Sequence, residues 1–189
     1  MKNILIMGIG RAGKTTLSNM IKNKYKDYNL VHSDCIKWAI IRAKGMEKYY
    51  STNIRKQKEF EHGEEFQKIL LEFFASSIRN DTNKDGYILE SGQLQPKLVR
   101  EYIDFNNTQV ICLGHGNLTK QDIIDLCRNH DKKEDWTYDV SDEELEAHAE
   151  KWAEMNEELK RDCPKYGIKY IDTSKNREEI LNKLLNEIR

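Results

Sequence analysis

The sequence of 189 residues lacks the features that mark secreted, membrane-spanning or multidomain proteins. No apolar run approaches the ~20 residues that span a bilayer. Met1 leads directly into the first expected strand, so we expect no signal peptide. Only two prolines occur and no segment is rich in glycine and serine, so nothing resembles an interdomain linker. We therefore expect a single domain over residues 1–189 that makes no contact with a membrane.

An excess of either charge is also absent, and cysteine is sparse. The 31 basic residues are matched by 32 acidic ones, and a formal net charge of −1 gives no general attraction to a polyanion. Nucleic acid is therefore a disfavoured partner, although a local basic site is compatible with this composition. The four cysteines include no CxxC pair, which is typical of reduced thiols in a cytoplasmic protein. Neither feature indicates an oligomeric state.

Short apolar runs and helical segments alternate along the chain, which is the pattern of a parallel sheet covered by helices. The expected strands lie at residues 4–7, 29–32, 87–89, 110–113 and 168–171. The expected helices lie at residues 14–24, 34–42, 55–78, 97–105, 122–128, 142–162 and 177–188. This alternation predicts an α/β fold with a doubly wound, five-stranded parallel sheet. In such a fold the ligand binds at the carboxyl ends of the strands.

The middle of the chain carries less information. Residues 45–53 are expected to be irregular, and apolar residues at helical spacing predict one long amphipathic helix over about 55–78. The segment over about 42–80 contains no recognisable motif, and we expect the substrate-binding helices there. Further on, Ser141 and Glu144 form a capping box that opens another long helix. Its charges alternate in sign, which predicts a solvated face.

The most specific motif is the run from Gly8 to Thr15, Gly8-Ile9-Gly10-Arg11-Ala12-Gly13-Lys14-Thr15, which matches GxxxxGK[ST] between an apolar strand and a helix. Glycine is needed where the backbone turns tightly and its N–H groups approach phosphate oxygens. Lys14 is expected to reach the β- and γ-phosphates, and Thr15 to place its hydroxyl on Mg²⁺. The helix that begins there adds its positive end. With Thr16, these residues predict a site for a nucleoside triphosphate, ATP, together with Mg²⁺.

The residues after the second strand face the same crevice. A carboxylate at Asp34 is placed to orient an attacking alcohol or to accept its proton, or else Asp34 or Ser33 merely caps the helix. Trp38 and Arg42 follow Asp34 at i+4 and i+8 and therefore share one helical stripe. Trp38 either stacks on a flat substrate or belongs to the core. Arg42 either holds a substrate phosphate or lies in solvent.

With the phosphate loop, Asp34 and the strand alternation, the chain resembles the small P-loop kinases of the nucleoside-monophosphate-kinase group. The spacing from the loop to Asp34 is similar to that in polynucleotide 5′-kinases, zeta-toxin kinases and chloramphenicol phosphotransferase. The resemblance covers the whole chain at the level of the fold, but only the phosphate loop is specific. It implies that Asp34 is the base toward a substrate hydroxyl.

The resemblance also suggests roles for residues at the end of the third strand. Glu90 stands where related proteins often carry an aspartate, which implies that it holds a Mg²⁺-bound water; alternatively, it pairs locally with Lys14 or a backbone N–H. Ser91 or Gln93 is expected to contact the acceptor. Two departures from the group are clear. The glycine triplet of shikimate kinases is not reproduced by Ser91-Gly92-Gln93, and the arginine pattern of adenylate kinases is missing.

The group places a small helical lid after the fourth strand, here over about 126–140, and Arg128 is the expected lid cation. The alternative is an exposed charged turn, which the neighbouring acidic residues favour. After the fifth strand, the loop at 172–176, with Thr173, lies where such kinases cradle adenine, although it also resembles an ordinary helix cap.

These residues are compatible with three functions. The favoured one is an ATP-dependent kinase that moves the γ-phosphate to a hydroxyl or phosphate of a small molecule or nucleotide. A nucleotide-dependent switch is the alternative, but the guanine-reading Asn-Lys-x-Asp is missing. A polynucleotide end-kinase is disfavoured by the lack of basic excess. The zinc-like spacings Cys112-x2-His115 and Cys127-x2-His130 are disfavoured as ligands because Cys112 lies in an apolar strand.

Overall fold

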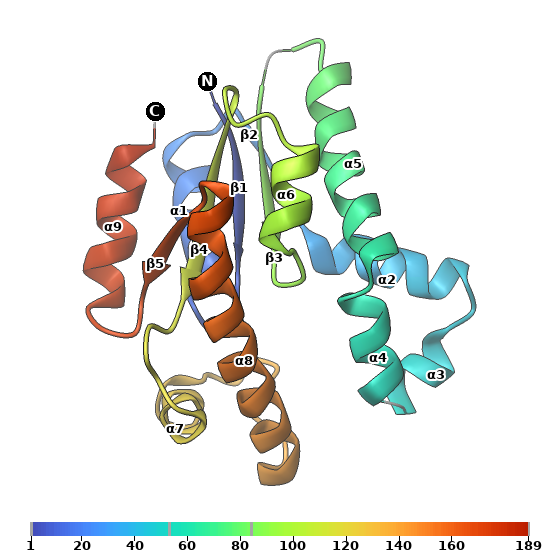
Figure 1. Cartoon of the computed structure of the whole chain (residues 1–189), viewed down its shortest axis with the longest axis vertical. Coiled ribbons are helices and arrows are strands. Elements are labelled where there is room, and N and C mark those ends of the chain that lie inside the picture. Colours follow the sequence, from blue (N-terminus) through green and yellow to red (C-terminus); the bar gives the residue numbers. More distant parts are fainter. Residues whose placement is uncertain (1, 53, 84, 189) are drawn as a thin grey trace.

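A sheet of five strands lies at the centre of the computed structural model, which describes residues 2–52, 54–83 and 85–188 (Figure 1). The strands lie in the order β2-β3-β1-β4-β5, and every neighbouring pair is parallel. This confirms the predicted doubly wound α/β fold. The strands are β1 (Asn3–Gly8), β2 (Tyr28–His32), β3 (Gly86–Ser91), β4 (Thr108–Gly114) and β5 (Lys169–Asp172).

Helices cover both faces of the sheet (Figure 1). One face carries α1 (Lys14–Lys24) and α9 (Arg177–Glu187), and the other carries α5 (Glu64–Asn80), α6 (Pro96–Tyr102) and α8 (Asp142–Asp162). Toward the carboxyl ends of the strands lie α2 (Ser33–Ala43), α3 (Glu47–Thr52), α4 (Ile54–Glu61) and α7 (Lys120–His130). A short 3₁₀ helix, η1 (Cys163–Tyr166), joins α8 to β5. Both termini lie at the opposite end of the molecule (Figure 1).

The core is built around β1, of which all six residues are buried. This strand pairs with β3 on one side and β4 on the other, so Leu5 lies between Leu89 and Val110. A strand that is covered on both faces and both edges has no polar side to present, which explains its continuous apolar sequence. The loop that follows β1 therefore starts from a rigid strand at the centre of the sheet.

The segment between β2 and β3 departs from the sequence expectation. The residues expected to be irregular form α3, and the single helix predicted over about 55–78 is wrong because α4 and α5 are separate helices. The break falls at Gly63, where a Cβ would lie 2.8 Å from the carbonyl oxygen of Glu59. The rings of Phe60 and Phe66 pack across the break with their centroids 5.0 Å apart. Apolar spacing continues through this break because both helices face the same core.

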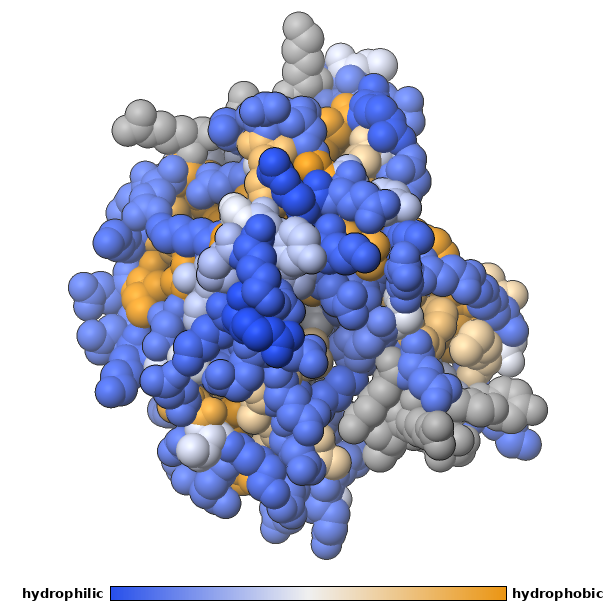
Figure 2. Space-filling model, viewed as in Figure 1, coloured by the Kyte–Doolittle hydropathy of each residue, from blue (hydrophilic) through white to orange (hydrophobic). Residues whose placement is uncertain are grey.

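Elsewhere the boundaries agree well with the sequence patterns. Helix α1 has the predicted bounds, and the side chain of Ser141 accepts a hydrogen bond from the backbone N–H of Glu144 at the start of α8. The surface in view is mainly hydrophilic, as expected for a chain with 33% charged residues (Figure 2). Among the described residues, none of the helices combines the length and apolar character needed to cross a membrane.

Candidate active site

The loop over residues 8–15 begins where the buried strand β1 ends. Gly8, Arg11 and Gly13 have left-handed backbone conformations, with φ values of 136°, 61° and 94°. A Cβ on Gly8 would lie 2.0 Å from the carbonyl oxygen of Leu113 in β4, so only glycine fits there. Turns of this kind direct successive backbone N–H groups into a concavity that suits an anion. The loop then enters α1, whose N-terminus adds positive potential.

Polar side chains converge at the carboxyl ends of β1, β2 and β3. The Nζ of Lys14 donates a hydrogen bond of 2.7 Å to the carbonyl oxygen of Ile9 and lies 3.9 Å from Oε1 of Glu90. The other carboxylate oxygen, Oε2 of Glu90, lies 3.5 Å from the hydroxyl of Thr15 and 2.9 Å from Nδ1 of His32. The structure thus brings together the predicted phosphate-binding lysine and both predicted metal ligands, and adds His32 to them.

Lys14 is buried, and burial lowers the pKa of its ammonium group, while the carboxylates of Glu90 and Asp34 act in the opposite direction. A buried charge is costly unless other charges or hydrogen bonds compensate it. Here one carbonyl oxygen and one carboxylate at 3.9 Å compensate it only in part. The ammonium group is therefore well placed to gain from a phosphate oxygen at the loop.

The oxygen donors beside Lys14 fit Mg²⁺. The hydroxyl of Thr15 and the carboxylate of Glu90 lie 3.5 Å apart, and both are hard oxygen ligands. Over residues 2–52, 54–83 and 85–188, no three His, Cys, Asp or Glu side chains gather as a metal site. A magnesium ion held here would therefore take its other ligands from phosphate oxygens and water. The same finding disfavours the zinc alternative, and all four cysteines are free thiols.

Asp34 lies in the first turn of α2, across from the phosphate loop. His32 occupies the N-cap position of this helix, and no side chain there accepts a capping hydrogen bond. The interpretation of Asp34 or Ser33 as the cap is therefore wrong. Oδ1 of Asp34 instead accepts from Nζ of Lys37 at 2.8 Å, and its side chain is 66% exposed. Lys37 is mostly buried and also pairs with Glu61 at 3.1 Å. The carboxylate is thus oriented by α2 yet open to a ligand.

The other residues of the α2 stripe are exposed. Trp38 is 41% exposed, and its ring meets that of Tyr50 edge to face at a centroid distance of 5.2 Å. The core alternative for Trp38 is therefore wrong. Arg42 lies exposed in the last turn of α2. The structure places both residues on the helix that carries Asp34, but neither joins the cluster around Glu90.

Gln93, the predicted acceptor contact, links the end of β3 to α2. Its Oε1 accepts hydrogen bonds from the hydroxyls of Ser33 and Ser91, each at 2.9 Å. The preceding residue, Gly92, runs close to the lysine of the phosphate loop: a Cβ there would lie 3.8 Å from Nζ of Lys14. The loop after β3 therefore reaches from the phosphate-binding residues to the wall of the neighbouring cavity.

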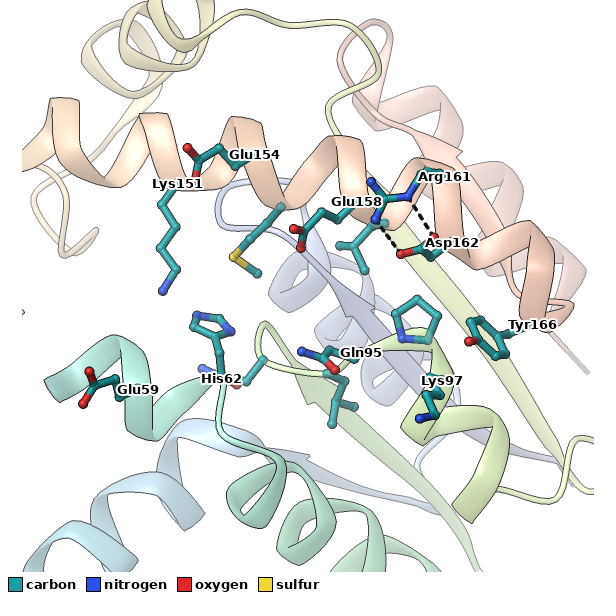
Figure 3. A pocket seen from close by; sticks show the side chains of 15 residues that line it. Glu59, His62, Gln95, Lys97, Lys151, Glu154, Glu158, Arg161, Asp162 and Tyr166 are labelled. Atoms are coloured by element: carbon teal, nitrogen blue, oxygen red, sulfur yellow. Dashed lines mark hydrogen bonds and ion pairs between the residues drawn. The ribbon is translucent and has the colours of Figure 1, made fainter. Parts of the chain in front are cut away.

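That cavity has a volume of about 650 Å³ and lies between α8, the α4–α5 junction and the loop after β3 (Figure 3). Gln93 and Leu94 line it on the sheet side. Lys151 on α8 points toward His62 on the opposite wall (Figure 3). The volume of the cavity is typical of a small-molecule site. The remaining lining is mostly polar or charged: Glu59, Gln95, Pro96, Lys97, Glu154, Met155, Glu158, Leu159, Arg161, Asp162 and Tyr166.

Helix α8 is thus more than the solvated helix that its charges predict. Lys151, Glu154 and Glu158 follow at helical spacing and line the cavity. Another side of the helix is buried, and there Trp152 lies against the phosphate loop, where a Cβ on Gly10 would come within 2.3 Å of its ring. These contacts are not evident from the sequence, because alternating charges conceal a narrow buried stripe on this helix. That stripe comprises the apolar residues Leu145, Ala149, Trp152 and Leu159 and the polar residue Asn156.

Arg11 directs its side chain at the segment after α7, where the lid was expected. Its guanidinium pairs with Asp135 at 2.7 Å and with Asp131, and the hydroxyl of Thr137 in turn contacts Asp131. The backbone of Arg11 belongs to the predicted phosphate loop, but its side chain joins that loop to the segment after α7. The expected lid over about 126–140 comprises the end of α7 and these turns.

Arg128, the expected lid cation, forms its contacts with the segment that follows α7. Its Nη2 donates to the carbonyl oxygen of Val140 at 2.8 Å and to Asp142 at 2.7 Å. Thr173, expected at the adenine site, is fully buried, and its hydroxyl donates to the carbonyl oxygens of Ala12 and Gly114 at 2.9 and 3.0 Å. Its side chain supports the phosphate loop from below. The structure thus separates Arg128 and Thr173 from the cluster around Lys14.

No family model and no curated protein matches the sequence. Solved structures match the fold over nearly the whole chain. Shikimate kinase from Acinetobacter baumannii, in complex with shikimate, has a TM-score of 0.57 at 18% identity, with 100% of this chain and 93% of that chain covered. A gluconokinase from Sinorhizobium meliloti 1021 has a TM-score of 0.55 at 12% identity, with 98% and 90% covered.

A deoxyadenosine kinase from M. mycoides with bound dATP has a TM-score of 0.51 at 18% identity, and 97% of this chain and 99% of that chain are covered. Each of these structures matches the fold of this chain over at least nine-tenths of both chains. The chain therefore has the fold of the small P-loop kinases, which confirms the resemblance inferred from the phosphate loop and the strand alternation.

Proposed function

We propose that this protein is an ATP-dependent phosphotransferase that moves the γ-phosphate to a hydroxyl or phosphate group of a small molecule or nucleotide. The observation that carries the proposal is the convergence of Lys14, Thr15 and Glu90 at one edge of the sheet, next to a cavity of about 650 Å³. The fold shared with small P-loop kinases supports it.

The phosphate loop binds the triphosphate through its backbone N–H groups, and Lys14 neutralises charge on the β- and γ-phosphates. Thr15 and Glu90 would hold Mg²⁺, which when bound would neutralise part of the phosphate charge. Thr16, exposed in the first turn of α1, lies beside the same phosphates. His32 fixes the Glu90 carboxylate from β2 at 2.9 Å. This grouping stabilises charge where the phosphoryl group leaves ADP.

Asp34 orients the acceptor hydroxyl and takes its proton as the new bond to phosphorus forms. Lys37 holds this carboxylate in place through its 2.8 Å contact and is itself held by Glu61. Trp38 and Arg42, exposed on the same helix, extend the acceptor surface away from the phosphate loop. The acceptor itself enters from the cavity and meets Gln93, whose amide is fixed by two serines.

The character of the cavity favours a polar acceptor. Acidic and basic side chains from α8 oppose His62 and the polar residues of the loop after β3. Such a lining recognises hydroxyl, amine or phosphate groups better than a purely apolar molecule. Structures with this fold include a shikimate kinase with shikimate and a deoxyadenosine kinase with dATP, so both small hydroxylated molecules and nucleosides belong in a screen.

The test is a screen with γ-labelled ATP and Mg²⁺ against nucleosides, nucleotides, sugars, amino alcohols and short oligonucleotides. Label should appear on one acceptor class in the native protein and disappear in Lys14→Ala. Lys26→Ala is the matched control because this lysine is exposed and lies outside the site. Hydrolysis to free phosphate that no acceptor suppresses would favour the nucleotide-dependent switch instead.

A further inference from the structure

One arginine lies within the phosphate loop and another beside it, and among the described residues only the first has an acidic partner. Arg11 pairs with Asp131 and Asp135. Arg177, the first residue of α9, is half-buried, and its Nε is buried without a hydrogen-bond partner. Within the described ranges, no carboxylate forms an ion pair with Arg177. A partly buried guanidinium without a counter-charge is unfavourable by itself.

The surroundings of Arg177 add to this cost. Burial lowers the pKa of Arg177, and the positive charge of Arg11 lowers it further. A cation at the N-terminus of a helix also meets the positive end of the helix dipole. The acidic residues Glu178 and Glu179 follow in the same turn but are exposed and form no ion pair with it. The neighbouring ring of His115 is fully buried and contributes no negative charge.

The position of Arg177 relates it to the phosphate loop. Its Cδ would lie 3.4 Å from a Cβ on Gly13, so its aliphatic part packs against the last turn of that loop. The connection before it is fixed, because Thr173 is hydrogen-bonded to Ala12 at 2.9 Å. Arg177 follows β5, whereas Glu90 lies near the end of β3, and these strands lie on opposite sides of β1. Arg177 therefore faces the phosphate loop from the side opposite the acceptor.

We infer that Arg177 binds the phosphate chain of the nucleotide from the side opposite Asp34 and Glu90. This inference rests on the proposed function, because it requires a triphosphate in the loop. The anion supplies the counter-charge that the guanidinium lacks and relieves its repulsion with Arg11. A planar guanidinium is well suited to hold two phosphate oxygens at once. Arg177 thereby anchors the part of the nucleotide that stays behind when the γ-phosphate moves.

The experiment compares the binding of ATP and of inorganic tripolyphosphate, by calorimetry, to the native protein, Arg177→Gln and Lys183→Gln. Lys183 is the matched control because it is an exposed cation on the same helix, α9, and has no assigned role in the site. Loss of one charge-assisted contact should weaken both ligands by about 10-fold to 100-fold in Arg177→Gln and by less than about 2-fold in Lys183→Gln. The melting temperature without ligand should stay the same or rise.

Each contrary result has a separate meaning. If Arg177→Gln binds both ligands as the native protein does, or if Lys183→Gln is equally impaired, the assignment of Arg177 is overturned. If only ATP binding weakens, Arg177 contacts the nucleoside, which also overturns it. Weak binding that accompanies a lower melting temperature would make Arg177 a structural residue. Failure of the native protein to bind either ligand would instead contradict the proposed function.

Discussion

The replacement Asp34→Asn separates chemistry from structure at the acceptor side. The side chain keeps its size but loses the charge that would orient and deprotonate an acceptor hydroxyl. Turnover should therefore fall by about 10²–10⁴-fold, the usual range for loss of a general base. ATP affinity should change little, because the nucleotide contacts come from the phosphate loop.

The structure limits what the same change does to stability. Asp34 loses an exposed ion pair with Lys37, of the class that contributes about 0.2–1 kcal/mol, and a favourable position in the first turn of α2. Lys37 retains Glu61 at 3.1 Å, so no buried cation is left unpaired. We expect a loss of about 0.5–1.5 kcal/mol, which lowers the melting temperature by roughly 1–6 °C for a chain of this size.

The assay measures acceptor phosphorylation, ATP affinity and thermal unfolding on three proteins: native, Asp34→Asn and Glu64→Gln. Glu64 is the matched control, because it forms a 2.6 Å helical ion pair with Lys68 and its side chain is 65% exposed. Its replacement should lower stability to a similar extent without loss of turnover. An Asp34→Asn protein with native turnover, or a Glu64→Gln protein that loses as much, would refute the role given to Asp34.

Three further predictions follow from the same geometry. Lys14→Met should lower phosphate transfer by about 10²–10³-fold or more. The free energy of unfolding should change by less than about 1.5 kcal/mol, because the variant no longer buries an ammonium group and this gain opposes the lost contact with Glu90. A large loss of stability would contradict this balance. Arg11→Gln should free residues 131–141 from the phosphate loop, and hydrogen exchange in that segment should quicken, whereas unchanged protection would show that other contacts hold it. His115 is buried and burial lowers its pKa to about 4. Because the unfolded chain then binds more protons between pH 4 and its ordinary value of about 6.5, stability should rise with pH across this window. Denaturant unfolding of His115→Asn should show a flatter pH profile, and an identical slope would contradict the pKa assignment.

The fold was largely predictable from the sequence because the short apolar runs of the buried strands and the period-3.6 patterns of the helices were strong. The phosphate loop and the strand alternation gave the sheet and the place of Lys14, Thr15 and Glu90, all of which the structure brings together. The break between α4 and α5 was not predictable, because apolar spacing continues across it. Local patterns report which face of a helix is buried, but not where that helix turns.

The roles of distant residues were harder to predict for a different reason. Arg11 and Arg128 were both expected to contact the nucleotide. In the structure, the side chain of each is instead bound by acidic or carbonyl partners from other parts of the chain. Thr173 was placed correctly in its loop, but its hydroxyl bonds to the backbone beneath the phosphate loop. The direction of a side chain depends on its neighbours in the tertiary structure, and a single sequence does not show which residues these are.

The coupling of ATP consumption to acceptor phosphorylation tests the central proposal most directly. For the acceptor that the screen identifies, ADP and phosphorylated acceptor should form in a ratio close to one, with little free phosphate. Both products should disappear together in Lys14→Ala. If ADP instead forms with an equal amount of free phosphate whatever molecule is offered, the protein is a nucleotide hydrolase or switch, and the account of Asp34 and the cavity is contradicted.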